Sequence, residues 1–449
     1  MDLNSLFDPN SVAVIGATDK EDSVGLELCR NLMESDRNLF FVNPNRDEVL
    51  GKDTYESVKD IDQKIDLVIV AVPAAIVPEV VEEIPENTGS VIIISAGFAE
   101  SGEEGQKRQE EVKQILSQKN IPLLGPNCLG IISPSTNLNA SFAPATPQEG
   151  SVAFLSQSGA LIDSVIDKSL AEEYGFSSLV SFGNQADINV RDLLSHFKKD
   201  DATKAIALYI EGVKKGKKFI EKAKEVVKEK PVVVLKSGVT TKGKEAVGSH
   251  TGSLAGDAEI YEAAFRKAGI FQVHTIEQLL QTSLTLAERQ PCDNNIGIVT
   301  NGGACGVMAT DWCEKYGVQL AELSEETLDK LDDSEVMDPA FSRRNPLDIV
   351  GDASSERYKV AIESLLEQED IEGLIVIQTL QAMTDAEKNA EVIIEAQNSY
   401  NKPILPCFIG GKMTKPGVGL LTKNNIFNFS EPKRAVLAMK ALIQQNNFN

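Results

Sequence analysis

The sequence predicts an α/β protein built from three consecutive doubly wound domains. Short apolar runs rich in β-branched residues alternate with longer helical patterns along the 449-residue chain, which is typical of parallel strands buried on both faces. Strand–helix alternation of this kind implies right-handed βαβ units and open sheets. A chain of this length has room for two to four domains.

Three series of predicted strands define the domains. The first series lies at 12–16, 67–72, 91–95 and 121–125, the second at 152–156, 179–183, 205–210 and 232–236, and the third at 296–300, 373–378 and 404–408. Helical patterns separate them, for example at 103–119 and 258–268. A proline-rich stretch and a polar break divide the series, so we expect domains at 1–145, 146–290 and 291–449. The second and third begin alike, with a strand, a polar glycine-containing turn and a helix, as a distant duplication or common α/β packing would produce.

Composition and charge argue against several classes of protein. Hydrophobic residues make up 42% of the chain and charged residues 25%, which is ordinary for a globular protein. No apolar run approaches the length of a membrane span, and the N-terminus lacks the pattern of a secretion signal. The six cysteines show no paired spacing, so we expect neither disulfides nor a metal site, and a reducing cytoplasm. A net charge of −23 without a basic stripe argues against nucleic acid as a partner.

The first predicted strand leads into a loop, 16–25, that is suited to a phosphate-bearing ligand. It directly precedes a helix, where free N–H groups and the helix dipole favour anions. The loop lacks the GxGxxG pattern, and the next predicted strand, 39–42, ends in Asn43 and Pro44 rather than in an acid. An NAD site needs that acid for the ribose hydroxyl, so a dehydrogenase is disfavoured. A tight structural turn is the alternative.

Other strands of the first domain also end in polar or glycine-rich turns, at 72–74, 95–98 and 125–130. These turns fall at the carboxyl ends of strands, where open α/β sheets bind ligands. Each one alone is compatible with an ordinary βα turn. Four such endings along one edge favour a ligand site.

The second domain contains a comparable turn at 156–160, with the sequence SQSGA. Serine or glycine near a helix start satisfies free N–H groups, and so does a bound phosphate oxygen. A plain N-cap and a phosphate site are therefore both compatible with this turn.

His250 is the histidine whose surroundings suggest chemistry. It stands in the segment GSHTGSLAGD, 248–257, whose three glycines predict an exposed, tightly folded loop with backbone N–H groups able to approach an anion. An imidazole in such a loop can attack phosphorus and carry the phosphoryl group, although a mere glycine-rich turn is the alternative. We expect His196 and His274 to be structural or solvent-facing.

Together these segments resemble the α subunits of NDP-forming acyl-CoA synthetases, the family of archaeal ADP-forming acetyl-CoA synthetase and succinyl-CoA synthetase. The resemblance covers nearly the whole chain, through FDPNSVAVIGAT, GPNCLG, SQSGA, YIEG, GSHTGSLAGD, TNGG and NPLDI. GSHTGSLAGD, at its spacing after SQSGA, is the most specific element. The resemblance implies a Rossmann-like CoA-binding domain followed by two flavodoxin-like domains, the first of which carries a phosphohistidine loop.

The resemblance also implies a reversible reaction in which acyl-CoA, ADP and phosphate give a carboxylic acid, CoA and ATP. An acyl phosphate would pass its phosphoryl group to His250, whose ring Glu211 would hold. The implied CoA contacts are Gly16, Thr18, Lys20, Gly25, Asn43, Pro44, Val72, Pro73, Ser95, Gly97 and Asn127. The implied phosphate contacts are Ser156, Gln157, Ser158, Gly159 and Gly252. Cys128 would neighbour the thiol of CoA, and we expect it to be a buried packing residue.

No segment resembles an ATP-grasp fold, so the resemblance implies that ADP or ATP and Mg²⁺ bind on a separate ATP-grasp β subunit. The other substrates would be small molecules: acyl-CoA, a carboxylic acid and phosphate. The third-domain loop at 302–306 departs from the family pattern. The sequence leaves two alternative functions. A catalytically idle CoA-binding regulatory module is disfavoured by His250, and an NAD(P)-linked dehydrogenase by Asn43 and Pro44.

Overall fold

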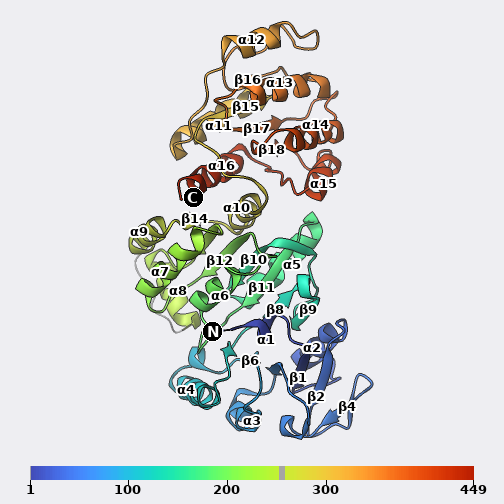
Figure 1. Cartoon of the computed structure of the whole chain (residues 1–449), viewed down its shortest axis with the longest axis vertical. Coiled ribbons are helices and arrows are strands. Elements are labelled where there is room, and N and C mark those ends of the chain that lie inside the picture. Colours follow the sequence, from blue (N-terminus) through green and yellow to red (C-terminus); the bar gives the residue numbers. More distant parts are fainter. Residues whose placement is uncertain (1, 252–257, 449) are drawn as a thin grey trace. The chain divides into compact units, whose positions relative to one another are not determined.

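The computed structural model describes the backbone of residues 2–251 and 258–448, and the side chains of all of these except 248–251. The chain divides into two compact units, Met1–Ala171 with Gly175–His274, and Glu172–Tyr174 with Thr275–Asn449. In the described residues the first unit contains two sheets of seven strands each, and the second unit contains one sheet of four strands (Figure 1). None of the described helices combines the length and the apolar character that crossing a membrane requires.

The first sheet has the strand order β3-β4-β2-β1-β5-β6-β7. Its strands are β1 (Ser11–Ile15), β2 (Asn38–Val42), β3 (Glu48–Val49), β4 (Lys52–Tyr55), β5 (Leu67–Val70), β6 (Ser90–Ile93) and β7 (Leu123–Leu124), and its helices are α1 (Asn4–Phe7), α2 (Val24–Met33), α3 (Val77–Glu83) and α4 (Glu103–Gln118). Successive residues of β1 enter different buried clusters. Val12 and Val14 share a cluster with α2, whereas Ala13 and Ile15 share one with α3 and α4. Helices therefore cover both faces, as a doubly wound sheet requires.

The second sheet has the order β14-β13-β12-β10-β11-β8-β9. Its strands are β8 (Gly130–Ser133), β9 (Leu138–Ser141), β10 (Glu149–Ser156), β11 (Phe176–Ser181), β12 (Ala205–Ile210), β13 (Val232–Lys236) and β14 (Phe271–Val273), and its helices are α5 (Gly159–Glu172), α6 (Val190–Phe197), α7 (Gly216–Val227), α8 (Thr241–Thr251) and α9 (Ala258–Ala268). The β8–β9 hairpin is antiparallel and pairs with β11. It joins the second sheet although it follows β7 directly in the chain.

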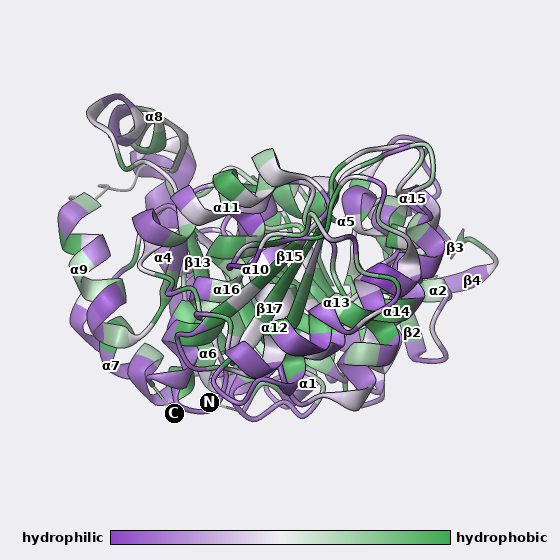
Figure 2. Cartoon of the chain, turned by 90° about the horizontal axis from the view of Figure 1, so that it is seen from above, coloured by the Kyte–Doolittle hydropathy of each residue, from purple (hydrophilic) through white to green (hydrophobic). Residues whose placement is uncertain are grey.

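The third sheet has the order β16-β15-β17-β18 and is parallel throughout. Its strands are β15 (Ile296–Thr300), β16 (Leu347–Asp348), β17 (Gly373–Gln378) and β18 (Ile404–Phe408), and the helices of this unit are α10 (Ile276–Glu288), α11 (Gly303–Tyr316), α12 (Glu325–Asp332), α13 (Ser355–Glu367), α14 (Ala386–Ser399), α15 (Lys415–Lys423) and α16 (Pro432–Asn446). Every residue of β13, β15 and β17 is buried, and Figure 2 shows these strands predominantly in the colour of hydrophobic residues.

The predicted fold class is confirmed: each strand of the three predicted series overlaps an observed strand, and the sheets are doubly wound. The domain boundaries at 145 and 290 stay predictions. Residues 130–141, on the first-domain side of the predicted boundary, complete the second sheet. Helix α10 lies in the second compact unit.

The predicted loop at 248–257 is wrong for its first four residues, because α8 continues to Thr251. The helix is favoured at its start, where the Thr240 hydroxyl accepts a hydrogen bond from the N–H of Gly243 at 3.1 Å. An ion pair between Lys242 and Glu245 adds support one turn apart. Residues 252–257 lie outside the described residues.

The second and third sheets repeat one local structure where a strand meets a helix. The Ser156 hydroxyl, at the end of β10, donates to the carbonyl oxygen of Ser158 at 2.8 Å and accepts from its N–H at 3.0 Å. Thr300, at the end of β15, makes the same two contacts with Gly302, at 3.1 and 3.0 Å. A helix follows in each case. The likeness seen in the sequence therefore extends to hydrogen bonding.

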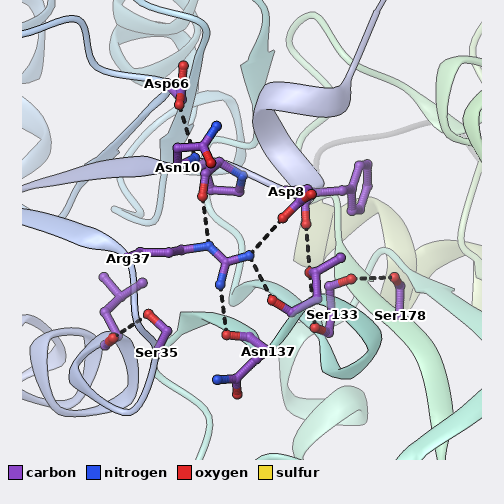
Figure 3. Close-up of polar contacts among 12 residues, drawn as sticks. Asp8, Asn10, Ser35, Arg37, Asp66, Ser133, Asn137 and Ser178 are labelled. Atoms are coloured by element: carbon purple, nitrogen blue, oxygen red, sulfur yellow. Dashed lines mark hydrogen bonds and ion pairs between the residues drawn. The ribbon is translucent and has the colours of Figure 1, made fainter.

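Arg37 joins the start of β2 to the β8–β9 hairpin (Figure 3). Its guanidinium donates to the carbonyl oxygens of Pro9, Thr136 and Asn137 at 2.8 to 2.9 Å, and to Asp8 at 3.1 Å. Only 10% of its side chain is exposed. Because a planar guanidinium satisfies several acceptors at once, this residue holds the two sheets of the first unit together.

Arg37→Met should lower the stability of the first unit by about 3–5 kcal/mol, because three carbonyl oxygens, two of them in part-buried contacts, lose a charged donor. The midpoint of urea unfolding, followed by circular dichroism, measures the change. Arg30→Met is the matched control, since Arg30 is 47% exposed and pairs only with Glu21 and Glu27 among the described residues, an arrangement worth below about 1 kcal/mol. Equal midpoints for the two variants would contradict the role given to Arg37.

Candidate functional site

The loop between β1 and α2 folds back so closely that two of its glycines cannot carry a side chain. Gly16 has φ +96°, and a Cβ there would lie 2.6 Å from the carbonyl oxygen of Ala71. A Cβ on Gly25 would lie 2.3 Å from the carbonyl oxygen of Gly16. The loop therefore depends on close backbone approach, which also leaves room for a phosphate near backbone N–H groups.

Polar contacts shape the remainder of this loop. The Thr18 hydroxyl accepts from the N–H of Lys20 at 3.1 Å. The Asn43 amide donates to the carbonyl oxygen of Ala17 at 2.7 Å. Asn43, which stands where an NAD site would have its ribose-binding acid, therefore fixes the loop. The side chains of Lys20 and Pro44 are exposed. Lys20 therefore offers this loop a positive charge that is open to solvent.

The ends of β5 and β6 are tied to each other. The Ser95 hydroxyl donates to the carbonyl oxygen of Val72 at 2.5 Å. Gly97 has φ +106° and donates its N–H to Oε1 of Glu100 at 2.6 Å. Burial acts to raise the pKa of Glu100, but hydrogen bonds from Asn184 and from nearby backbone N–H groups hold it below its usual value. Glu100 thus stays ionised and fixes this turn.

Residues 125–130 hydrogen-bond to both sheets of the first unit. The N–H of Asn127 donates to the carbonyl oxygen of Ser95, and the N–H of Asn184, after β11, donates to that of Pro126, both at 3.0 Å. A Cβ on Gly183 would lie 2.3 Å from the carbonyl oxygen of Pro126. The predicted CoA-binding strand ends are therefore locked to the second sheet.

Helix α5 begins beside this segment. A Cβ on Gly159 would lie 3.2 Å from Cβ of Leu129, so the helix start sits close to residues 125–130. The Ser158 hydroxyl accepts from the N–H of Leu161 at 3.3 Å and acts as an N-cap. Ser156 is fully buried, and its hydroxyl is engaged within the turn, so it shapes the turn.

A cavity of about 630 Å³ lies between the strand ends of the first sheet and the start of α5. It is lined by Val24, Ala71, Val72, Pro73, Ala74, Ile94, Ser95, Ala96, Asn127, Cys128, Leu129, Phe142, Gln157, Ser158, Gly159, Ala160 and Asp163. It brings four of the predicted CoA contacts and three of the predicted phosphate contacts to one space. Predicted contacts outside its lining are Gly16, Thr18, Lys20, Gly25, Asn43, Pro44, Gly97 and Ser156.

Gln157 connects the cavity to Glu211, which directly follows β12. Oε1 of Gln157 accepts from the backbone N–H groups of Glu211 and Gly212, the latter at 3.1 Å. Glu211 is 5% exposed. Burial lowers the pKa of neighbouring Lys236, and attraction to Glu211 opposes that shift. The Lys236 ammonium also lies 4.8 Å from the ring centroid of Tyr261.

The histidines differ in what the structure describes. The backbone of His250 is part of α8. The side chain of His250, and the whole of Gly252, lie outside the described part of the chain. His196 stacks on Phe7 with ring centroids 4.3 Å apart, and burial lowers its pKa, so it is a neutral packing residue. His274 is exposed.

Cys128 is buried against the end of β6. Its Sγ donates to the carbonyl oxygen of Ile93 at 3.4 Å, and burial raises the pKa of the thiol to about 12. The protonated thiol is a packing group, as expected from the sequence. Among the described side chains, no group of three or more His, Cys, Asp and Glu residues is placed to hold a metal ion.

Besides the predicted contacts and Cys128, the cavity is lined by residues that sequence reasoning did not name as contacts: Val24, Ala71, Ala74, Ile94, Ala96, Leu129, Phe142, Ala160 and Asp163. Val24 had a signal, because it lies in the loop already considered for phosphate. Phe142 and Asp163 had none: one follows the unpredicted hairpin, and the other is an acid inside an ordinary helical pattern. Asp163 is the one charged residue among the described residues that line the cavity.

Comparisons with known proteins agree with this geometry. Residues 10–134 match the CoA binding domain family, and residues 149–286 match the succinyl-CoA ligase like flavodoxin domain family. The α subunit of acetate–CoA ligase (ADP-forming) II from Pyrococcus furiosus is 39% identical over 99% of this chain and 98% of its own length. Acetate–CoA ligase (ADP-forming) I from Archaeoglobus fulgidus is 40% identical over 98% of this chain, which spans 63% of that relative.

A solved structure shows the same fold over the full length. It is the dinucleotide-forming acetyl-coenzyme A synthetase 1 of Ca. Korarchaeum cryptofilum, in complex with phosphate and ADP. It superposes with a TM-score of 0.93 at 32% identity, covering 100% of this chain and 97% of the other. By sequence and fold, the chain belongs to the family of ADP-forming acetate–CoA ligases and matches their separate α subunits along almost their whole length.

Proposed function

We propose that the chain is the α subunit of an ADP-forming acyl-CoA synthetase. Acyl-CoA, ADP and phosphate give a carboxylic acid, CoA and ATP, reversibly, through an acyl phosphate and a phosphohistidine at His250. The observation that carries this proposal is the shared cavity. A thioester held along the strand ends would meet a phosphate held at the helix start, and such proximity is what a reaction between the two requires.

In the first step the start of α5 orients phosphate for attack. The free N–H groups and the dipole of a helix N-terminus hold an anion without any cationic side chain, and none of the described lining residues is Lys, Arg or His. A phosphate oxygen attacks the thioester carbonyl carbon, the carbon–sulfur bond breaks, and CoA leaves. Cys128 does not compete as a nucleophile, because its raised pKa keeps the thiol protonated.

In the second step His250 receives the phosphoryl group. Nε2 of the imidazole attacks phosphorus, the bond from phosphorus to the acyl oxygen breaks, and the carboxylic acid leaves as its anion. Glu211 accepts the Nδ1 proton in a hydrogen bond, which fixes the tautomer. The contact of Gln157 with the backbone of Glu211 supports this role, since one residue then adjoins both the phosphate and the carboxylate.

ADP and Mg²⁺ bind, in this proposal, on an ATP-grasp β subunit that receives phosphate from His250. Two findings support a separate partner. The relative from Pyrococcus furiosus is named as a subunit, and the chain spans 63% of the Archaeoglobus fulgidus relative. The remaining length of that relative is the part we assign to the partner.

Ala96→Phe should weaken CoA binding roughly tenfold or more. Ala96 lines the cavity yet its side chain is exposed, so a larger residue fills ligand space without disturbing the core. Isothermal titration of CoA into the purified chain measures the loss. Ala382→Phe, at an exposed position outside the lining, is the control. Undiminished CoA affinity in the Ala96 variant would place CoA elsewhere.

His250→Ala should abolish both ATP formation and the acid-labile label left on the chain by labelled phosphate and acyl-CoA, because no imidazole remains to carry the phosphoryl group. CoA affinity should stay near that of the wild type. His274→Ala, at an exposed histidine, should keep the label. Full turnover of the His250 variant with its partner would show that phosphate passes directly from acyl phosphate to ADP.

Glu211→Gln should slow phosphoryl transfer by roughly 10²- to 10⁴-fold, the usual range for losing a positioned acid–base partner. The substitution preserves shape, so rapid-quench measurement of labelled phosphohistidine should show slower formation with CoA affinity unchanged. Glu221→Gln on α7 changes the same charge at an exposed position and should leave the rate unaltered. Equal rates in both variants would exclude Glu211 from the step.

A further inference from the structure

Asp163 occupies a distinctive place in the cavity. It is the fifth residue of α5, one helical turn beyond Gly159, where the proposed phosphate site begins. The cavity around it is largely apolar, with Val24, Ala71, Val72, Pro73, Ala74, Ile94, Ala96, Leu129, Phe142 and Ala160 among its lining residues. The other polar residues of the described lining are Ser95, Asn127, Gln157 and Ser158, and all four are neutral.

One oxygen of the Asp163 carboxyl lacks a hydrogen-bond donor among the described residues. Oδ1 of Asp163 is buried and has no hydrogen-bond partner in the described part of the chain. Burial raises the pKa of the group, and no neighbouring cation offsets that effect. By contrast, Asp167, one turn further along α5, is exposed to water. A buried acceptor without a partner is costly, so a helix acid with no other role would be expected to resemble Asp167.

We propose that Asp163 selects the acyl group, by accepting a hydrogen bond from a hydroxyl or ammonium group on the acid's carbon chain. This inference rests on the proposed function and names its substrate class: short hydroxy or amino acids are preferred over their unsubstituted counterparts. An unsubstituted acyl chain would remove water from the carboxyl without donating a hydrogen bond to it. A second carboxylate on the acid would meet a like charge.

Helix geometry sets the length of the preferred acid. Residues four apart on one helix are separated by about 6 Å along its axis. The thioester carbon lies at the phosphate, near Gly159 in the proposed function, so a donor that meets Asp163 is carried roughly three or four bonds further along the chain. Acetate is too short to reach. Four-carbon acids with a terminal hydroxyl have the matching length.

CoA itself offers a second source of the same chemistry, because its pantetheine arm contains amide N–H groups. The two sources differ in what they predict. If the donor is on the acyl chain, removing the Asp163 carboxyl lowers the affinity for the hydroxylated thioester only. If the donor is on the pantetheine arm, removing the carboxyl lowers the affinity for every CoA compound equally, including free CoA.

The test is isothermal titration of the full chain with CoA, butyryl-CoA and 4-hydroxybutyryl-CoA, comparing the wild type with Asp163→Ala and with the control Asp167→Ala. The wild type and the control should bind 4-hydroxybutyryl-CoA roughly tenfold more tightly than butyryl-CoA, as expected for one hydrogen bond to a charged acceptor. Asp163→Ala should bring the two affinities together, with CoA unchanged. 4-Aminobutyryl-CoA should follow the hydroxylated compound.

Equal affinities for the two thioesters in the wild type would overturn the inference while leaving CoA binding, and the proposed function, in place. A uniform loss for all CoA compounds in Asp163→Ala would assign the donor to the arm and also overturn it. No binding of any CoA compound to the wild type would instead count against the proposed function.

Thermal unfolding supplies a second measure. Asp163→Ala should raise Tm more than Asp167→Ala does, because both substitutions gain helix propensity and only the first removes an unpaired buried oxygen. An equal rise in Tm for the two variants would contradict the claim that an unpaired oxygen of Asp163 destabilises the protein.

Discussion

The candidate site depends on the short segment from Gly125 to Gly130, which belongs to two sheets at once. Its backbone bonds to the end of β6 through Asn127 and to the turn after β11 through Pro126. Close approach is required at its far end as well, since Gly130 has φ +110° and a Cβ there would lie 2.2 Å from the carbonyl oxygen of Ala140. A sheet edge that binds CoA and a helix start that binds phosphate are useful together only at a fixed separation. This segment fixes it.

The electrostatics of the cavity differ from those of the chain as a whole. A protein with a net charge of −23 does not attract phosphate or CoA over long distances. Binding must then come from short-range contacts, and the lining offers helix-terminal N–H groups and neutral polar side chains rather than described cations. Such dipoles are already oriented before the reaction and remain so as negative charge moves from the attacking phosphate oxygen to the departing sulfur. Asp163, beyond the helix start, places negative charge where the acyl chain rather than the phosphate would lie.

The sequence was sufficient for most strands of the three sheets, because each of these is a short β-branched run buried on both faces, a pattern that is local. The strands β3, β4, β14 and β16, of two to four residues each, were not predicted. The β8–β9 hairpin was missed because each strand has four residues and its partner, β11, lies far along the chain. The glycines of 248–257 predicted a loop, yet capping by Thr240 and the Lys242–Glu245 pair extend α8 into it. The place of Asp163 in the cavity lining had no local signal at all, because the ends of β5 and β6 that line the same cavity lie more than sixty residues earlier.

Gln157 lies between the part of the site assigned to acyl phosphate formation and the part assigned to phosphoryl transfer, and it contacts both. Its side chain lines the cavity, its N–H donates to the carbonyl oxygen of Tyr209 at 3.2 Å, and its amide oxygen accepts from the backbone of Glu211. The residue that adjoins phosphate is thus anchored to β12, the strand that presents the carboxylate proposed to hold His250. Acyl selection, by contrast, is assigned to α5, one turn beyond the phosphate. Since acid recognition and phosphoryl transfer rest on different elements that meet at Gln157, the acyl pocket can change without disturbing the histidine chemistry.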